Sequence, residues 1–440
     1  MLFVPIVAER DGHEFIADAV AAGAAAYLTA GPIPPPGTGV SSVAGVTGLL
    51  VADTAAALTA LGAAARARLA DRVIGVTGSV GKTSVKDLLA AALSTTFVTT
   101  AAANSFNNEL GVPLTLCNGP DASEAAVIEM GARGQGHIAQ LCRVARPTVG
   151  VVTRVAPAHL ELFGSLQDVA RAKGELIEAL PAGPAGVAVL NAEDPLVLAM
   201  ASRGPASVLT YAARPPGGSA GGVEVWAEGI RVDSQARARF ELHSPWGSSP
   251  VALSVAGVHM VGNALAALAA AMAVGVGLAD AVGGIEAAAL SPWRMEVSTA
   301  ASGATILNDA YNASPVAVLA AFEALLALGP PGRGRRLAVL GLMAELGEGS
   351  GAAHVGLAAE AARRGIELFA VGTAKYGVDP TRRWPDVESA ALALEQMGLS
   401  ANDVVLVKAS RVAGLERLAQ RLAVGGRPST PARNTSPSSP

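Results

Sequence analysis

The sequence predicts an α/β protein in which helices cover both faces of doubly wound parallel sheets. From Val73 onward, short runs rich in β-branched residues alternate with longer alanine- and leucine-rich runs, a pattern typical of parallel strands joined by helices. Hydrophobic residues make up 51% of the chain but aromatic residues only 4%, so we expect helices to pack closely on strands through small side chains. A chain of 440 residues has room for two or three domains.

The first section, residues 1–68, is expected to be a small α/β unit. An apolar strand is predicted at Leu2–Val7, a helix near Ile16–Ala22 and a loop rich in proline and glycine at Gly31–Gly39. The opening residues contain no basic leader and no long apolar core, so we do not expect a signal peptide.

The second section, residues 69–292, is predicted to hold the central parallel sheet. Its candidate strands are Val73–Thr77, Phe97–Thr100, Ala125–Glu129, Val149–Thr153 and Val187–Leu190. Between residues 206 and 255 the pattern changes to short alternating segments, which predict a small antiparallel insert at Val223–Val232 and Ala236–Leu242. The longest apolar run, Ala264–Leu278, is shorter than the ~18 residues of a membrane span and predicts a buried helix starting near His259.

The third section, residues 293–424, repeats the alternation of strands and helices. Its candidate strands are Thr305–Asp309, Leu337–Gly341, Leu368–Gly372 and Val404–Lys408, which predict a second, Rossmann-like α/β domain. Residues 425–440 are rich in Ser, Pro, Arg and Thr, so we expect a disordered tail.

The composition also bears on partners and compartment. A net charge of −4 and a pI near 5.9 give no electrostatic footprint for nucleic acid or an anionic membrane. Two cysteines, Cys117 and Cys142, are too few for a disulfide framework and suit the cytoplasm. We expect a monomer, although no sequence feature determines the oligomeric state.

The clearest chemical signal is a strand, a glycine turn and a helix start within Val73–Ser84. Glycines let a backbone turn tightly with its N–H groups pointing inward, and the helix N-terminus adds a partial positive charge. Lys82 can then reach the β- and γ-phosphates of a nucleotide, and the Thr83 hydroxyl can ligate Mg²⁺. The expected nucleotide contacts come from Gly78, Ser79, Val80, Gly81, Lys82, Thr83 and Ser84.

This phosphate-binding loop (P-loop) departs from the general motif at one position. The pattern G-x-x-x-x-G-K-[ST] has a glycine where this chain has Val76, so the match is to the shorter form G-x-x-G-K-T. A plain glycine turn is the alternative, but the flanking strand and helix favour a nucleoside triphosphate site.

Three further residues are candidates for the same rim of the sheet. Glu129 ends a predicted strand, where ligands gather in open parallel sheets, so it is either a metal ligand or a solvated acid. His159 follows the next strand on that rim, but an isolated histidine more often serves only as a hydrogen-bonding residue. Lys173 lies on a predicted helix, Leu166–Leu180, where the pattern alone favours a solvated lysine.

Two polar groups outside the P-loop suggest substrate contacts. Asn107 and Asn108 lie in a polar cluster before an apolar helix; they either cap that helix or line the acceptor side of a cleft. In the third section, polar residues follow predicted strands and can either face a cleft between domains or remain surface groups: Arg294, Asp309, Tyr311, Asn312, Lys408, Ser410 and Arg411.

Together these segments resemble the Mur ligases, most closely the members that add D-alanyl-D-alanine to UDP-N-acetylmuramoyl-tripeptide. The likeness runs through nearly the whole chain, and the order and spacing of its motifs are highly specific. Those motifs are T-G-S-V-G-K-T-S-V-K-D (77–87), N-S-F-N-N-E-L-G-V-P-L-T-L (104–116), I-E-M-G-A-R-G-Q-G-H-I (128–138), A-H-L-E-L-F-G-S-L (158–166), A-K-G-E (172–175), L-N-A-E-D-P (190–195), S-P-W-R-M-E (291–296), N-D-A-Y-N-A-S-P (308–315), M-A-E-L-G (343–347) and V-K-A-S-R (407–411).

The resemblance implies a three-domain fold and assigns roles. Residues corresponding to Glu129 and His159 help to hold Mg²⁺ with the P-loop hydroxyl of Thr83, and the lysine corresponding to Lys173 is carbamoylated. An ammonium would repel Mg²⁺, whereas a carbamate offers an anionic oxygen. Asn263 resembles the residue that meets the nucleotide base, and Arg294 and Asp309 resemble contacts to phosphate and ribose. The resemblance thus implies catalytic roles for Lys82, Lys173 and His159.

The implied reaction forms an amide bond at the expense of ATP, through an acyl phosphate. It takes UDP-N-acetylmuramoyl-tripeptide and D-alanyl-D-alanine as substrates and belongs to peptidoglycan precursor synthesis. Two alternatives remain: a related ligase that adds glutamate to folates, and a nucleotide-binding protein that has lost ligase activity.

Some positions depart from the family pattern. The segment from Phe3 to Ile16 resembles an internal part of the family's first domain, so we expect the domain that binds the UDP end of the substrate to be shortened. Arg154 stands where relatives usually carry asparagine and places a cation near the expected metal site. Leu342 and Ser314 replace a common aspartate and asparagine.

Overall fold

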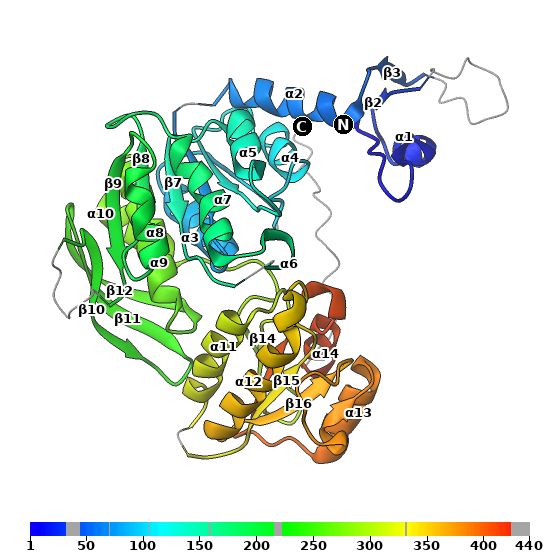
Figure 1. Cartoon of the computed structure of the whole chain (residues 1–440), viewed down its shortest axis with the longest axis vertical. Helices are drawn as coiled ribbons and strands as arrows, with labels where there is room; N and C mark the ends of the chain where they lie inside the picture. The colour runs from blue at the N-terminus through cyan, green and yellow to red at the C-terminus, as the bar shows by residue number, and fades with distance from the viewer. Residues whose placement is uncertain are drawn as a thin grey trace, which may run out of the picture.

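The computed structural model describes residues 1–31, 45–69, 71–103, 105–157, 160–214, 222–330 and 332–423. Within these residues the strands form sheets of three, nine and six strands, which follow one another along the chain (Figure 1). The predicted tail at 425–440 and nearly all of the predicted loop at Gly31–Gly39 lie outside the described residues, as does His159.

The first sheet is small and entirely parallel, in the order β1-β2-β3. The predicted strand at Leu2–Val7 is shorter in the structure, where β1 ends before Pro5, a residue that cannot donate to a strand ladder. Figure 1 shows this unit projecting to one side, joined to the rest of the molecule by helix α2. The elements are β1 (Leu2–Phe3), a 3-10 helix (Gly12–Phe15), α1 (Ile16–Ala21), β2 (Ala26–Thr29), β3 (Thr47–Leu50) and α2 (Thr54–Arg66).

The nine-stranded sheet carries the P-loop strand near its middle. Its order is β12-β11-β10-β9-β8-β7-β4-β6-β5, so β4 lies between β6 and β7. Every residue of β4 is buried, because helices cover both faces. The strands are β4 (Val73–Thr77), β5 (Thr99–Ala101), β6 (Ala125–Glu129), β7 (Val149–Val152), β8 (Val187–Asn191), β9 (Ser207–Ala212), β10 (Val225–Val232), β11 (Arg237–Ser244) and β12 (Gly247–Ala256).

The expected antiparallel insert is instead an extension of this sheet. Strand β9 pairs in parallel with β8, and β10 pairs in parallel with β9. Only β10, β11 and β12 form an antiparallel meander. The alternating sequence pattern was correct for those strands, but it carries no information about which neighbour the first of them pairs with.

Helices cover the central sheet on both sides. One face packs against α3 (Lys82–Leu93), α9 (Met260–Ala273) and α10 (Leu278–Glu286), the other against α5 (His137–Ala145) and α7 (Leu166–Glu178). Every residue of α9 from 264 to 271 is fully buried, and six of these eight are alanines. No helix among the described residues combines the length and hydropathy that crossing a membrane requires.

The six-stranded sheet has the order β13-β14-β18-β15-β16-β17 and is parallel except for edge strand β13. Its strands are β13 (Glu296–Thr299), β14 (Thr305–Asn308), β15 (Arg336–Leu340), β16 (Glu367–Val371), β17 (Arg383–Trp384) and β18 (Val404–Lys408). Helices α11 (Pro315–Ala327) and α12 (Ser350–Arg363) pack together, as do α13 (Val387–Met397) and α14 (Glu416–Leu422). The sheet thus has the expected doubly wound form.

Candidate functional site

The P-loop is a tight turn that needs its glycines. Gly78 and Gly81 have φ of 146° and 88°, in the region that side chains rarely adopt. A Cβ on Gly78 would overlap the hydroxyl of Thr153, and a Cβ on Gly81 would lie 2.6 Å from Asn263 Oδ1. Helix α3 begins immediately afterwards at Lys82, so its free backbone N–H groups open onto the turn.

Neighbouring loops hold the turn in place. The Ser79 backbone N–H donates to Arg154 O at 2.6 Å, and the Ser79 hydroxyl donates to Ala156 O at 3.0 Å. The Thr153 hydroxyl donates to Val80 O at 2.6 Å. These bonds engage both the side chain and the backbone N–H of Ser79, and they fix the shape of the turn.

Lys82 lies folded over the turn, where Nζ donates to Gly78 O at 2.8 Å. Burial lowers the pKa of Lys82, the Glu129 carboxylate opposes this shift and Arg294 adds to it. A lysine in this position faces the place that an anionic phosphate would fill.

Glu129 lies at the end of β6, only 1% exposed. Its Oε2 accepts a hydrogen bond from the Thr83 hydroxyl at 2.7 Å, and its Oε1 accepts one from Asn107 Nδ2 at 2.8 Å. The Ser105 hydroxyl lies 3.0 Å from Thr83 Oγ1. A carboxylate beside two hydroxyls is a set of oxygen donors that suits Mg²⁺, so the residues present fit the metal that the resemblance implies.

Lys173 is buried rather than solvated. Its residue is 4% exposed on α7, and among the described residues it has no hydrogen-bond partner. Burial, together with the nearby charge of Lys82, lowers the pKa of Lys173 well below its usual range. The solvated lysine favoured by the sequence pattern is therefore wrong.

Asn107 and Asn108 separate into two roles. Asn107 joins Glu129, as described above, whereas Asn108 Oδ1 accepts the N–H of Gly111 at 2.9 Å at the start of α4 (Gly111–Cys117). The capping interpretation thus applies to Asn108, whereas Asn107 contacts the acidic group beside the P-loop.

Arg294 reaches the P-loop from the segment that leads into the third sheet. Its Nη2 donates to Thr83 Oγ1 at 2.8 Å and to Ser105 Oγ at 3.2 Å, and its guanidinium stacks on Tyr311 at 4.2 Å. Its Nε is buried without a hydrogen-bond partner in the described part of the chain. Two cations, Lys82 and Arg294, therefore converge on the P-loop and the start of α3.

Asp309 and Lys408 meet at the carboxyl ends of β14 and β18. They form a buried ion pair, and Lys408 Nζ also donates to Asn312 O at 2.8 Å. Asp309 Oδ1 accepts the N–H of Met295 at 3.2 Å. The surface charge expected by default is wrong for Lys408, which is 3% exposed.

The two remaining candidates of the third region lie near this pair. Ser410 Oγ accepts the N–H of Ala344 at 2.9 Å. Arg411 is exposed, stacks on Trp293 at 4.3 Å and pairs with Glu416 at 2.7 Å.

Comparison with known proteins decides the family. Residues 76–271 match the Mur ligase middle domain, and residues 293–411 match the Mur ligase, glutamate ligase domain. The chain belongs to the Mur ligase family. The resemblance drawn from its motifs is confirmed.

Relatives and solved structures agree with this assignment. A UDP-N-acetylmuramoyl-tripeptide–D-alanyl-D-alanine ligase of Mycobacterium tuberculosis is 40% identical over 94% of this chain and 88% of its own length. The enzyme of the same name in Escherichia coli is 35% identical over 97% and 91%. A crystal structure of MurF from Acinetobacter baumannii superposes with a TM-score of 0.81 at 32% identity, covering 96% of this chain and 90% of that one. MurF from Thermotoga maritima, solved with ADP, gives a TM-score of 0.79 at 27% identity, covering 96% and 93%.

Two residues that contact the P-loop region of this Mur ligase were not singled out from the sequence. Thr153 ends the strand region beside the P-loop and binds its backbone, and Ser105 sits between Thr83 and Arg294. Ser105 lies within the motif N-S-F-N-N, two residues before Asn107, so the motif itself was the available signal. Thr153 had no signal beyond its place at a strand end.

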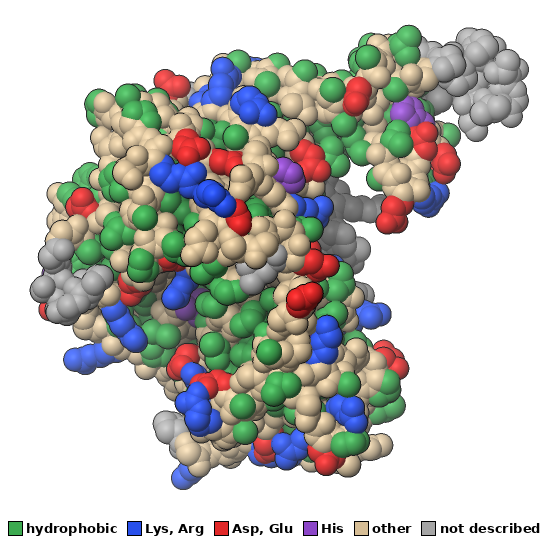
Figure 2. All heavy atoms as spheres, viewed as in Figure 1, with side chains coloured by type: hydrophobic (Ala, Val, Ile, Leu, Met, Phe, Trp, Pro, Cys, Tyr) green, Lys and Arg blue, Asp and Glu red, His purple; other side chains and the backbone are tan. Residues whose placement is uncertain are grey.

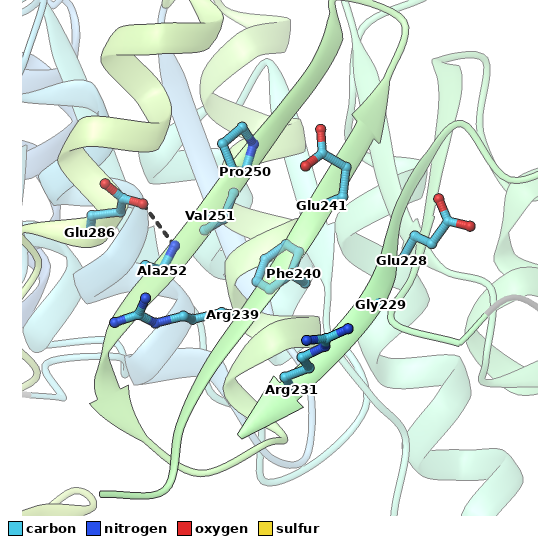
Figure 3. Close-up of a pocket in the computed structure, with 10 residues that line it drawn as sticks. All are labelled: Glu228, Gly229, Arg231, Arg239, Phe240, Glu241, Pro250, Val251, Ala252 and Glu286. Carbon is cyan, nitrogen blue, oxygen red and sulfur yellow. Dashed lines mark hydrogen bonds between the residues drawn. The ribbon is translucent and has the colours of Figure 1, made fainter. Parts of the chain in front are cut away.

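A separate hollow of about 580 Å³ lies far from these residues on the meander (Figure 3). It contains none of the site candidates. In Figure 3 most of its charged side chains extend from the strands of the meander, whereas Glu286 comes from α10 and accepts the N–H of Ala252 at 2.7 Å. Figure 2 shows acidic and basic side chains interspersed over the visible face of the molecule.

Proposed function

We propose that this Mur ligase joins D-alanyl-D-alanine to UDP-N-acetylmuramoyl-tripeptide, with ATP as the energy source, in peptidoglycan precursor synthesis. The observation that carries the proposal is the likeness to ligases of that name, which extends over 94% of the chain at 40% identity. The convergence of Lys82 and Arg294 on the P-loop supports it. No observation favours the alternative of a nucleotide-binding protein without ligase activity.

In the proposed reaction, a tripeptide carboxylate oxygen attacks the γ-phosphorus of ATP, and the bond to the β-phosphate oxygen breaks. This gives ADP and an acyl phosphate. The amine of D-alanyl-D-alanine then attacks the acyl carbon, the amide bond forms and inorganic phosphate leaves. Negative charge spreads over the transferring group, and Lys82 and Arg294 would stabilise it electrostatically from fixed positions.

We assign the metal site to Thr83, Glu129, His159 and Lys173, the last as its carbamate. When bound, Mg²⁺ would neutralise charge on the phosphates and hold them in line. Glu129 is held by two hydrogen bonds, so its carboxylate would keep one orientation while substrates bind and products leave.

We assign the remaining candidates to the substrates. Asn263 would meet the base beside Gly81, and Asp309 the ribose. Asn107, Ser410 and Arg411 would contact the tripeptide or dipeptide. For Asn108 and Lys408, the contacts described above favour an indirect role in substrate binding. Asn108 would hold the start of α4 in place, and Lys408 would hold Asp309 in place.

The function has a direct test. Phosphate release should require ATP and both substrates together. Release with ATP and the acceptors of a folate ligase would favour that related activity. Binding of ATP without amide formation under any pairing of substrates would favour the inactive alternative and overturn the proposal.

Carbamoylation of Lys173 has its own test. Only a neutral amine attacks CO₂, and the lowered pKa of Lys173 favours that form. Lys173→Ala should abolish turnover and be partly rescued by small carboxylates, and ¹³C-bicarbonate should give a carbamate carbon signal in the wild type alone. A near-normal rate in Lys173→Ala would contradict the assignment.

We also propose that the protein acts as a monomer in the cytoplasm. Both thiols are unpaired, and burial raises the pKa of Cys142 to about 12, so this thiol is unreactive. Light scattering during gel filtration measures the oligomeric state directly.

A further inference from the structure

Helix α3 holds a second polar contact one turn beyond the P-loop. Asp87 accepts two hydrogen bonds from Ser291, one from the backbone N–H at 2.7 Å and one from the hydroxyl at 3.0 Å. Lys86 Nζ lies 2.8 Å from the same carboxylate, and both charged side chains are at most 10% exposed. A bidentate, charge-assisted contact in a buried setting fixes the direction as well as the position of the partner.

Ser291 stands three residues before Arg294, in the segment between α10 and β13. The residues on either side of Arg294 both adopt left-handed backbone conformations, with φ of 62° at Trp293 and 50° at Met295. Neither is a glycine, so both conformations are strained. Such strain persists only where the surroundings determine the backbone from both sides.

The third region holds the other end of this segment. Trp293 O accepts the N–H of Tyr311 at 3.2 Å, and the Met295 N–H donates to Asp309. The Arg294 guanidinium stacks on the Tyr311 ring, from which its Nη2 reaches the Thr83 hydroxyl. The backbone around Arg294 is thus held by Ser291 on the N-terminal side, and the Arg294 side chain is held by Tyr311.

We propose that Asp87 and Ser291 are positioning residues that hold Arg294 against the phosphate site. One rigid helix, α3, would then set both cations: Lys82 directly, and Arg294 through the Asp87–Ser291 contact. This inference rests on the proposed function for its catalytic meaning, because a guanidinium must sit where charge develops in the transition state to accelerate the reaction. Asp87 and Ser291 themselves touch no substrate.

The test is a double-mutant cycle with Arg294. Ser291→Ala removes one hydrogen bond to Asp87 and should lower both kcat and ATP affinity. The expected loss in kcat is about tenfold, which is smaller than the ~100-fold loss that a 1 Å misplacement of a catalytic group can cause. In an Arg294→Ala background the same change should have no further effect on ATP affinity. Ser291→Thr keeps the hydroxyl and should retain most of the wild-type activity.

Two further variants complete the design. Asp87→Asn should reproduce the Ser291→Ala result, because an amide nitrogen cannot accept the bonds that the carboxylate accepts. Ser254→Ala is the matched control: Ser254 Oγ donates to Ala288 O at 3.0 Å and anchors the same segment to β12 rather than to α3. It should leave kcat and ATP affinity unchanged.

The outcomes separate the two proposals. The positioning role would be overturned if Ser291→Ala lowered ATP affinity equally with and without Arg294. It would also be overturned if Ser291→Ala left the ATP affinity of the otherwise wild-type protein unchanged. Equilibrium ATP affinity is measured without acceptor substrates, so the cycle gives its answer even if the two-substrate assay were to reject the ligase. Phosphate release by the wild type reports on the function alone.

Discussion

At the scale of single residues, the candidate site beside the P-loop contains buried polar groups that have hydrogen-bond partners. Glu129 keeps its carboxylate inside the protein through Thr83 and Asn107, which removes the cost of leaving a charged acceptor unsatisfied. The same two bonds orient both carboxylate oxygens at the edge of the P-loop. The charge of Glu129 is therefore the feature to remove selectively.

Glu129→Gln should weaken the response to magnesium. The amide keeps the shape of the side chain but loses the anion, so we expect the Mg²⁺ concentration for half-maximal activity to rise about 10- to 100-fold, the range seen when a group supporting a metal site is lost. Magnesium titration of phosphate release measures this change.

Glu124→Gln provides the control for that variant. Glu124 accepts the N–H of Val98 at 3.0 Å at the opposite end of β6, so its charge is remote from the P-loop. An unchanged magnesium requirement in Glu129→Gln would contradict the assignment of Glu129 to the metal.

The places of residues in the fold could be predicted where they are local to a motif. The glycines, Lys82 and Thr83 follow from strand, turn and helix start alone. The burial of Lys173 and the pairing of Lys408 with Asp309 could not be predicted from pattern, because they depend on which strands and helices become neighbours. For Lys173 only the family resemblance pointed to the site.

At the scale of elements, α3 and α5 begin in the same way. Gly81 precedes α3 with φ of 88°, and Gly136 precedes α5 with φ of 84°. A Cβ at Gly81 would meet Asn263, whereas one at Gly136 would meet nothing within 4 Å. The pair therefore separates backbone strain from damage to the proposed nucleotide site.

Gly81→Ala and Gly136→Ala should lose similar stability, about 1–2 kcal/mol for a left-handed residue with a side chain. Only Gly81→Ala should also lose ATP affinity, because it displaces Asn263. Thermal unfolding and equilibrium ATP binding measure the two effects. Loss of ATP affinity in both variants would show that the helix start, rather than the contact with Asn263, is responsible.

Helix α12 supports the loop after β15 through His354. Its Nε2 accepts the N–H of Met343 at 3.0 Å, and its Nδ1 lies 2.6 Å from Ser350 O. These partners assign a neutral ring with the proton on Nδ1. Burial and the charge of Lys375 lower the pKa of His354, although the bond to Ser350 opposes the shift.

This arrangement should make stability depend on pH. Because the pKa of His354 is lower in the folded protein than its ordinary value of ~6.5, the unfolded chain binds the proton more readily, and stability falls as pH drops below about 6.5. His354→Gln cannot titrate, so its melting temperature should be lower at pH 8 but should fall less between pH 8 and pH 5. Parallel curves for the two proteins would contradict this account.

Strands buried on both faces were the easiest elements to predict. The runs at β4, β6 and β18 match residue for residue, because a short and mostly apolar run between turns has few alternatives. Helix α2 was not predicted, since a run of alanines lacks the apolar periodicity that marks one face. The pairing of β9 with β8 was also missed, because strand order is a property of the folded sheet.

At the scale of the whole molecule, the proposed nucleotide site joins two sheets. The P-loop and Glu129 belong to the nine-stranded sheet, whereas Arg294 leads into the six-stranded one and stacks on its Tyr311. The site therefore spans the proposed boundary between the second and third domains, near residues 292–293.

ATP with Mg²⁺ should thus protect both regions from hydrogen exchange. A ligand that binds only the folded state at 100 times its Kd stabilises that state by about 2.7 kcal/mol, and contacts through Arg294 and Asp309 should extend this to peptides within 293–423. Exchange measured by mass spectrometry with and without ATP gives the answer. Protection confined to residues 71–292 would contradict a shared site.

The buried alanines of α9 limit the substitutions that this helix can accept. Side chains from 264 to 271 are fully buried against the central sheet, and a methyl group can be exchanged only for hydrogen or for something bulkier. Adding volume to a filled interior costs about 1–3 kcal/mol. In a saturation library this helix should therefore tolerate fewer replacements than the leucine-lined helices, and its evolutionary freedom should be correspondingly narrow.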